Sequence, residues 1–452
     1  MTLPSPFSTR MQSDLGETEW RLFCQTLESP PPISLHYHVL KNFNWQENIG
    51  KVKWYSNGVY LKERPVFTLD PAFHAGAYYV QEASSMFLAE ALRQLAPQKE
   101  GLNVLDLCAA PGGKSTLILS LLGESCLLLS NEVIRSRYQI LRQNLAKWAY
   151  PNAASSQHDS EDFLPLSGFF DVVLVDAPCS GEGLFRKDPE AVKEWSENHV
   201  QLCAARQRRI LGNAVQLLAP GGLLLYATCT YNDLENEENS HWLSTSAGLQ
   251  PRSISLESGW NIHSKQYGYQ FYPHRLQGEG FYLAAFQKST DSEKGIYKDK
   301  GKRLSGHSNL SKEELDRLDH WIRDSYLYHF YKNKSNDIIA IPSSKDEGVK
   351  RLASALPKSD WGITIGTFKG KDFIPDHHLA LSRLVAEGVP TAAVDRNTAL
   401  LFLKREPIPL EGQPEGWVLV TYEGLGLGWA KKLHNRVNNY LPKEWRIRME
   451  IN

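Results

Sequence analysis

The sequence has no excess charge of either sign, because its 50 lysine and arginine residues are balanced by 51 aspartate and glutamate residues. A nucleic-acid partner therefore cannot be inferred from net charge, and any basic surface must be local. Long apolar runs are also absent, since the richest stretch, residues 117–129, is interrupted by Gly123, Glu124 and Ser125. Residues 1–16 lack the charged and apolar regions of a signal peptide. We therefore expect no membrane partner.

Cysteine is scarce, and no two cysteines form a Cys-x-x-Cys pair. The six cysteines stand at positions 24, 108, 126, 179, 203 and 229. This spacing supports neither a disulfide framework nor a zinc site. A reduced, cytoplasmic protein fits best, and in that compartment a cysteine within a polar motif is a candidate for chemistry.

A chain of 452 residues predicts two or three compact units. Strand-like and helix-like segments alternate through residues 70–288, which predicts an α/β fold: a doubly wound, Rossmann-like sheet with helices on both faces. Four short apolar runs are typical of strands buried on both faces, and they cover residues 103–107, 126–130, 171–175 and 223–227. The predicted division is a small α+β region at 1–69, this domain at 70–288, a polar linker at 289–310 and a C-terminal region at 311–452.

Residues 104–116 (VLDLCAAPGGKST) combine a strand, a tight turn of small residues and an amphipathic helix. Such a turn lets the backbone approach a ligand closely and directs helix amides toward it. A phosphate-binding loop is the obvious competitor, because Gly113-Lys114-Ser115 is similar to its end. Cys108, however, stands where that motif requires its first glycine. The Gly-x-Gly-x-x-Gly fingerprint of dinucleotide sites is absent as well.

Three acidic residues follow predicted strands in chain order. Glu132 comes just after the second strand, Asp159 comes after a place where a further short strand would fit, and Asp176 ends the next strand. Because the carboxyl ends of parallel strands meet in one crevice, these acids can share a ligand. Each of them alone is more often a helix cap or a solvated turn residue.

Two cysteines lie at the same predicted edge. Cys179 follows a strand in Asp-Ala-Pro-Cys-Ser-Gly-Glu-Gly, and Cys229 follows another in Ala-Thr-Cys-Thr-Tyr. The runs DLCAAPGGKS, DAPCSGEGLFRKDP and YATCTY, together with GAYYVQEASSM and YPHRLQGEGF, resemble those of RNA 5-methylcytosine methyltransferases. The resemblance spans about residues 70–290 and extends more weakly to the C-terminal region. In the N-terminal region, where that family usually carries Arg-x-Asn-x-Leu-Lys, this chain has His36-Tyr-His-Val-Leu-Lys41.

The resemblance implies an enzyme that transfers a methyl group from S-adenosyl-L-methionine to carbon 5 of a cytosine in RNA. It implies that Cys229 is the nucleophile that attacks carbon 6, and that Cys179 helps to resolve the adduct. The implied cofactor-binding residues are Cys108, Ala109, Ala110, Pro111, Gly112, Gly113, Lys114, Glu132, Asp159 and Asp176, with Asp176 also near the base. The expected partner is 16S rRNA or the small ribosomal subunit, bound by a monomer whose C-terminal region is a PUA-like RNA-binding domain.

Elementary chemistry agrees with these roles. Carbon 5 of cytosine is a poor nucleophile until another group adds at carbon 6, and a thiolate is the side chain best suited to that addition near neutral pH. A carboxyl group at ring nitrogen 3 would stabilise the adduct. Three alternatives remain open: a tRNA substrate, a non-catalytic ribosome-assembly factor on the same fold, and cysteines that are simply buried apolar residues.

Overall fold

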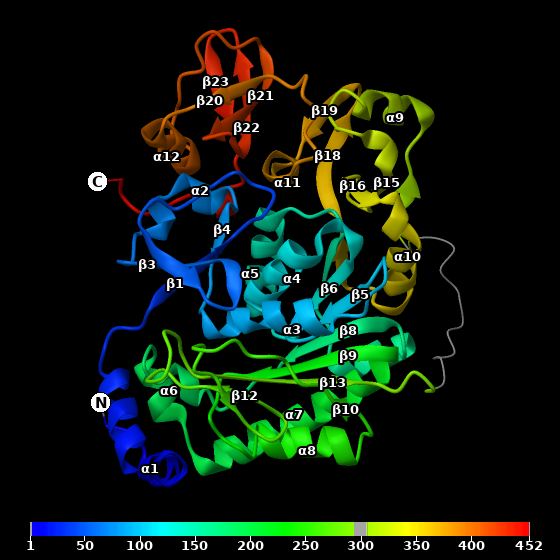
Figure 1. Ribbon diagram of the computed structural model, residues 1–452. Helices are drawn as coiled ribbons and strands as arrows, with labels where there is room; N and C mark the ends of the chain where they lie inside the picture. The colour runs from blue at the N-terminus through cyan, green and yellow to red at the C-terminus, as the bar shows by residue number, and fades with distance from the viewer. Residues whose placement is uncertain (1, 293–303, 305, 452) are drawn as a thin grey trace.

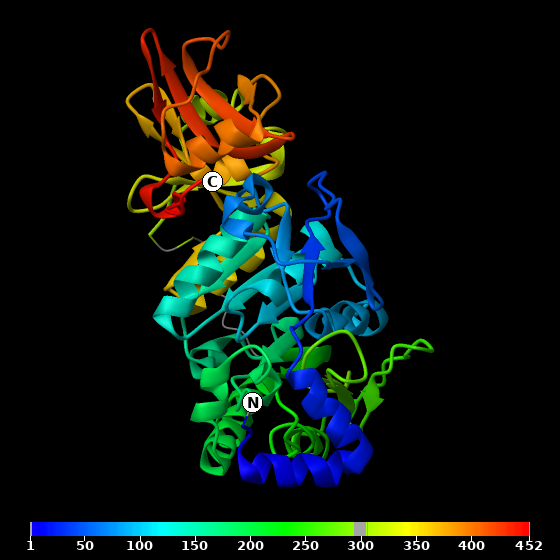
Figure 2. The ribbon, with the colours of Figure 1, turned by 90° about the vertical axis from the view of Figure 1, so that its left-hand side faces the viewer.

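The computed structural model describes residues 2–292, 304 and 306–451, and four β-sheets organise this part of the chain (Figure 1). Figures 1 and 2 show the N-terminal sheet lying between the large central sheet and the last sheet of the C-terminal region. Most of the predicted linker, residues 293–303 and 305, lies outside the described residues. No helix in the described residues is both long enough and apolar enough to cross a bilayer.

The central sheet is parallel in its middle, in the strand order β7-β6-β5-β8-β9. These strands are β5 (Asn103–Asp106), β6 (Leu127–Asn131), β7 (Ala153–Ser156), β8 (Phe170–Asp176) and β9 (Leu218–Thr228). The four predicted strands and the further short strand before Asp159 are confirmed. On the far side of β9 the sheet continues through two antiparallel strands, β13 (Phe281–Gln287) and β12 (Gly268–Phe271), and ends at β11 (His263–Ser264), while β10 (Gln250–Pro251) also pairs with β13.

Helices cover both faces of this sheet because its strands are apolar on both sides. One face packs against α3, α4 and α5, and the other against α7 and α10. Alternate residues of one strand serve the two cores, as with Val104 and Leu105. The helices are α3 (Leu88–Leu95), α4 (Gly113–Leu122), α5 (Arg135–Trp148), α6 (Pro189–Glu194), α7 (Glu197–Leu217), α8 (Glu237–Thr245) and α10 (Asp346–Ala355).

The N-terminal region begins with a long helix, α1 (Ser5–Leu27), and continues into an antiparallel sheet of order β2-β3-β1-β4. Its strands are β1 (Ile33–Tyr37), β2 (Asn48–Val52), β3 (Tyr55–Leu61) and β4 (Tyr78–Val80), and the short helix α2 (Pro71–His74) precedes β4. Because β4 pairs with β1, one strand of this sheet lies beyond the predicted boundary at residue 69.

His36 and His38 are buried beneath Trp148 of α5, with ring centroids 5.0 and 4.6 Å from the Trp148 ring. Burial lowers the pKa of His36 to about 3, so this imidazole stays neutral. The segment in which the chain departs from the family pattern therefore places two aromatic side chains in a core, away from solvent.

The C-terminal region contains two further sheets. The first has the order β14-β15-β16-β18-β19, with β14 (Ser308–Asn309), β15 (Tyr328–Lys332), β16 (Ile338–Pro342), β18 (Ile363–Lys369) and β19 (Asp372–Pro375). The second comprises β20 (Thr391–Ala393), β21 (Gly416–Tyr422), β22 (Leu425–Leu433) and β23 (Arg436–Asn439). Helices α9 (Lys312–Leu318), α11 (His377–Leu381) and α12 (Arg396–Lys404) accompany them.

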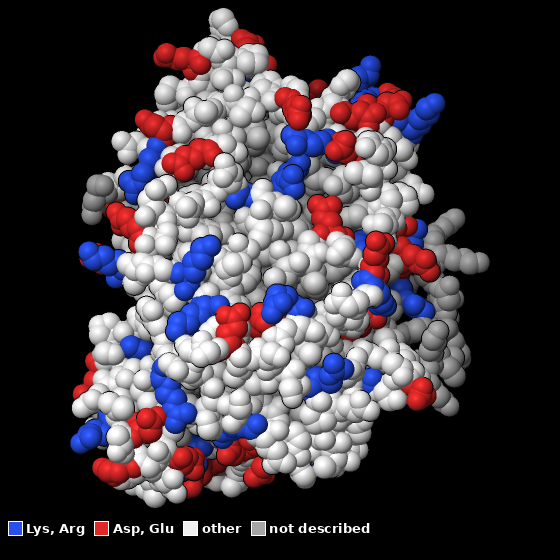
Figure 3. Space-filling model, viewed as in Figure 1, with Lys and Arg blue, Asp and Glu red and all other residues white. Residues whose placement is uncertain are grey.

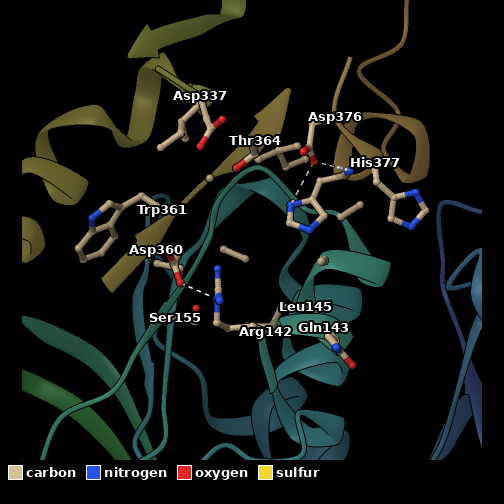
Figure 4. Close-up of a pocket in the computed structure, with 18 of the residues that line it drawn as sticks. Arg142, Gln143, Leu145, Ser155, Asp337, Asp360, Trp361, Thr364, Asp376 and His377 are labelled. Carbon is tan, nitrogen blue, oxygen red and sulfur yellow. Dashed lines mark hydrogen bonds and ion pairs between the residues drawn. The ribbon is translucent and has the colours of Figure 1, made fainter. Parts of the chain in front are cut away.

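These sheets are joined to the rest of the molecule. The short strand β17 (Ser359–Trp361) leaves the C-terminal region and pairs with β7 at the edge of the central sheet. Leu35 and Val59 of the N-terminal sheet share a core with Phe402 of α12 and Val418 of β21. At the β7–β17 edge a cleft of about 420 Å³ opens between α5 and the C-terminal region, lined by Arg142, Asp360 and Asp376 among others (Figure 4).

Candidate active site

The two sequence-predicted cysteines meet at the carboxyl edge of the central sheet. Cys179 follows β8 and Cys229 follows β9, and these strands run parallel with Asp176 opposite Ala227. Their Sγ atoms are 3.0 Å apart, and the backbone N–H of Cys229 donates a hydrogen bond to the Cys179 sulfur over 3.3 Å. All six cysteines of the chain are free. Two thiols from loops 50 residues apart in the chain therefore lie side by side at this edge.

The charges around the two sulfurs differ. The hydrogen bond between the two thiol groups and burial hold the pKa of the Cys179 thiol well above its usual range. Lys114 donates a hydrogen bond from Nζ to Asp176 Oδ2 over 2.6 Å, and its ammonium lies near Cys229. Burial alone would lower the pKa of Lys114, but the Asp176 carboxylate outweighs burial and raises it. The pocket thus sets a neutral thiol at Cys179 and a fixed positive charge near Cys229.

Buried polar side chains hold the two cysteine loops in place. The Glu235 carboxylate accepts hydrogen bonds from the Ser180 N–H and from Gln207 Nε2, which anchors the residue after Cys179. On the other loop, the Asn236 side chain donates to the Thr230 carbonyl over 3.0 Å and accepts from the Thr228 hydroxyl. The residues on both sides of Cys229 are therefore fixed by one amide.

Glu182 connects the loops to each other. Its side chain is fully buried, and Oε2 accepts a hydrogen bond from the backbone N–H of Tyr231 over 3.2 Å. Its neighbour Gly183 donates its N–H to the Cys229 carbonyl over 2.8 Å. Glu182 lies within the motif of Cys179, and Glu235 and Asn236 follow the motif of Cys229; both stretches contribute to the family resemblance, but the sequence assigned none of these three residues a role.

The predicted cofactor loop, Cys108 to Lys114, turns from β5 into α4. Gly112 occupies the N-cap position with φ of 114°, which a side chain would disfavour, and no side chain caps the helix. The loop carbonyls are engaged instead, since Arg137 donates to the Ala110 carbonyl and Asn144 to that of Pro111. Because no side chain caps α4, its first backbone amides can donate to a negatively charged ligand group.

Buried carboxyl groups complete this pocket. Asp106, at the end of β5, accepts a hydrogen bond from Ser115 on Oδ2, while its buried Oδ1 has no partner. Burial, opposed by the Ser115 bond and reinforced by Asp176, raises the pKa of Asp106 to about 7. Glu132 follows β6 and is held by the Ile134 N–H and Arg137. An unpartnered carboxyl oxygen beside open helix amides fits the ammonium and carboxylate of S-adenosylmethionine, and Glu132 stands where ribose hydroxyls would bind.

Asp159 differs from the other predicted pocket residues. It follows β7, as expected, but its carboxylate accepts two hydrogen bonds from Arg209 of α7, over 2.6 and 2.9 Å, and caps the 3₁₀ helix Ser160–Leu166. The Arg209 bonds lower the pKa of Asp159 to about 2. Asp106 interacts electrostatically with both Asp176 and Glu132, whereas Asp159 pairs with Arg209 of α7. Its role toward the cofactor stays a prediction.

Sequence comparisons identify relatives over nearly the whole chain. The family 16S rRNA methyltransferase RsmB/F matches residues 92–287, the N-terminal domain of 16S rRNA methyltransferase RsmF matches residues 3–83, and the methyltransferase RsmF PUA domain matches residues 389–447. Ribosomal RNA small subunit methyltransferase F of Vibrio vulnificus is 32% identical over 418 residues, which cover 87% of this chain and 84% of that protein. The chain belongs to this family.

A second relative agrees with this result, and a solved structure shares the fold. The methyltransferase F of Vibrio cholerae is 30% identical over 485 residues, 98% of each chain. A methyltransferase homologue from Pyrococcus horikoshii is 24% identical and superposes with a TM-score of 0.52 over 63% of this chain and all of its own, which shows the shared fold. The predicted family, methyltransferase sheet and PUA-like domain are confirmed. The PUA match begins at residue 389, so the sheet formed by β14–β16, β18 and β19 precedes it.

Proposed function

We propose that this protein methylates carbon 5 of a cytosine in 16S rRNA and that Cys229 is its nucleophile. As a member of the methyltransferase F family it is an S-adenosylmethionine-dependent rRNA (cytosine-C5-)-methyltransferase. The observation that supports the cysteine assignment is the pair of sulfurs 3.0 Å apart with the Lys114–Asp176 ion pair beside them. It also weighs against a non-catalytic factor, because buried charge is costly to keep without a use.

The nearby charges distinguish the two sulfurs. Cys229 is the sulfur near the Lys114 ammonium, whose charge stabilises a thiolate, and the thiol of Cys179 can donate a hydrogen bond to that thiolate. The Cys229 thiolate adds to carbon 6 of cytosine and forms a carbon–sulfur bond. Asp176, already in the pocket, contacts ring nitrogen 3 and stabilises the charge that the addition places on the ring. S-adenosylmethionine supplies an electrophilic methyl group.

Release of the product requires a second group. After carbon 5 has gained its methyl group it still carries a proton, and the carbon–sulfur bond breaks only when that proton leaves. The proton passes to Cys179 after that thiol has lost its own proton to solvent, or to a water beside it; the electron pair restores the carbon 5–carbon 6 double bond, and the Cys229 thiolate departs. Because Glu235 and Ser180 fix the loop of Cys179, this sulfur stays within reach of the adduct.

The target cytosine must leave its stack or lie in single-stranded RNA to reach the two sulfurs. The PUA domain, residues 389–447, binds the RNA outside the pocket. The protein acts as a monomer in the cytoplasm.

The test uses single cysteine variants with small-subunit RNA and radiolabelled S-adenosylmethionine. We expect Cys229→Ala to give neither methylated cytosine nor a covalent species, because no addition occurs. Cys179→Ala accumulates a protein–RNA adduct that survives denaturing electrophoresis, because addition proceeds while elimination stalls. Cys24→Ala, a free cysteine on α1, is the matched control and should behave as the parent protein. An adduct trapped in Cys229→Ala would instead make Cys179 the nucleophile. If bisulfite mapping finds the new methyl group in tRNA, the substrate is tRNA and not 16S rRNA.

A further inference from the structure

The N-terminal helix α1 packs against both cysteine loops. Phe7 and Phe23 of α1 are fully buried, with the Phe7 ring 5.0 Å from that of Phe185 and the Phe23 ring 5.3 Å from that of Tyr231. Phe185 lies six residues after Cys179, and Tyr231 lies two residues after Cys229. Figures 1 and 2 show α1 beside the elements that carry these loops. The N-terminal helix therefore packs against residues that follow both cysteines in the chain.

One ion pair also joins this helix to Glu182, the buried residue that connects the two cysteine loops. Arg10 of α1 donates a hydrogen bond from Nη2 to Glu182 Oε1 over 2.7 Å. The same carboxylate accepts from Trp195 Nε1 over 3.0 Å and, through Oε2, from the Tyr231 N–H. A buried carboxylate without a positive partner is strongly unfavourable. Arg10 supplies that positive partner, and a charge-assisted hydrogen bond of this kind is stronger than a neutral one.

The second half of α1 holds a third loop of the same site. Beyond a break at Gly16, Glu19 accepts hydrogen bonds from His274 and Arg275, over 2.9 and 2.8 Å. The residues that follow lead to Gly280, whose carbonyl lies against Gly183. All three loops around the sulfurs are therefore contacted by one helix, which carries neither Cys179 nor Cys229.

We propose that Arg10 is a positioning residue of the methylation reaction: by pairing with Glu182 it sets the distance between the Cys179 and Cys229 loops. This inference rests on the proposed function. It assigns to α1 a part in the chemical step, beyond any contact that the N-terminal region makes with RNA. Small displacements of reacting groups are costly, since a shift of about 1 Å can lower a rate by about a hundredfold.

The experiment is a charge cycle on the full-length protein, with single-turnover methyl transfer as the main measurement. We expect Arg10→Met to lower the rate about ten- to a hundredfold, with the affinity for S-adenosylmethionine and for RNA within about twofold of the parent. Arg10→Lys, which keeps the charge, should recover part of the rate. Glu182→Gln combined with Arg10→Met should also be faster than Arg10→Met alone, because no uncompensated charge is then buried. Arg21→Met, an exposed arginine of the same helix, is the control.

Several results would overturn the inference while leaving the proposed function intact. One is an Arg10→Met protein as fast as Arg21→Met, and another is a loss confined to RNA affinity, which would make α1 an RNA-binding element. A double variant whose losses simply multiply would show that the two residues act separately. Thermal unfolding of each variant identifies a general loss of folded protein. If the parent protein itself fails to methylate cytosine, the proposed function fails instead.

Discussion

Asp106 shows how a single residue is held in an unfavourable state for a ligand. Its carboxyl group is fully buried, one oxygen is satisfied by Ser115, and the other has no partner. An unpartnered buried polar atom destabilises the folded state. Such strain is typical of binding pockets, where a ligand group later satisfies the free atom.

The raised pKa of Asp106 gives a testable dependence of stability on pH. Because the folded-state pKa, about 7, lies above the unfolded value of 3.8, the folded state binds the extra proton between these values. The free energy of unfolding is therefore unaffected by this group below pH 4. It falls by on the order of 4 kcal/mol as the pH rises through 7, because ionising the buried carboxyl group disfavours the folded state. Asp106→Asn removes this loss, so without cofactor its melting temperature should exceed that of the parent protein at pH 8 by more than at pH 5.

The control for this prediction is Asp316→Asn, an exposed aspartate of α9. Its melting temperature should follow that of the parent protein at both pH values. A difference between Asp106→Asn and the parent that does not change with pH would contradict the prediction and would mean that Asp106 is ionised throughout.

At the scale of elements, the parallel pairing of β8 with β9 is what brings the two cysteines together. Each strand places its cysteine just beyond its carboxyl end, so that adjacent parallel strands place both on one edge. Between the two loops the backbone fits closely at Gly183. A Cβ atom there would lie 2.5 Å from the Gly280 carbonyl oxygen and 2.8 Å from that of Cys229.

Gly183→Ala should therefore separate the loops. Both clashing atoms belong to backbone, which cannot rotate away as a side chain can, so the loops must move. We expect a loss of about 1–3 kcal/mol in unfolding free energy and a fall in the single-turnover rate that exceeds any change in cofactor affinity. Gly388→Ala is the control, because its added Cβ meets no atom within 4 Å. Equal rates for the two variants would show that the loops tolerate the displacement.

At the scale of the whole molecule, the C-terminal region shares a sheet and a core with the methyltransferase domain. The strand β17 extends the central sheet, and Ile339 and Leu352 enter the core beneath β5 and β8. Removing residues 311–452 would expose this core, so loss of RNA binding after such a cut would not distinguish unfolding from loss of contacts. Charge substitution on the last sheet is the cleaner test.

Lysine and arginine are interspersed with acidic residues over the face shown in Figure 3, in keeping with the balanced net charge. In and directly after the PUA domain, Arg436, Arg446 and Arg448 are exposed. Replacing all three with Gln should weaken RNA binding. It should also reduce the slope of log Kd against log salt concentration by about 2 to 3 units. The reason is that RNA binding releases fewer counterions when three phosphate contacts are missing. The single-turnover rate at saturating RNA should not change.

The matched control replaces Lys369 and Lys371, exposed cations at the hairpin between β18 and β19. An unchanged salt slope in the triple arginine variant would mean that RNA binds elsewhere. An equal loss in the lysine control would mean that any exposed cation of the C-terminal region contributes.

The sequence alone determined the family, the strands of the central sheet, and the position of the Cys108–Lys114 loop and of the two cysteines at the ends of those strands. All of these rest on local runs: a continuous apolar strand, a turn of small residues, or a motif of about ten residues. Carboxyl ends of parallel strands meet at one edge whatever the details of packing. The meeting of Cys179 and Cys229 therefore followed once β8 and β9 were recognised as strands of one sheet.

Tertiary structure alone decided which distant side chains pair. Arg10 meets Glu182 across 172 residues, Arg209 of α7 takes up the Asp159 carboxylate, and β17 joins a sheet some 200 residues away in the chain. No local pattern encodes such contacts, because they depend on how helices and sheets pack after each has formed. The same residue types would be ordinary surface charges in another packing, so their part in the site is a property of the folded molecule.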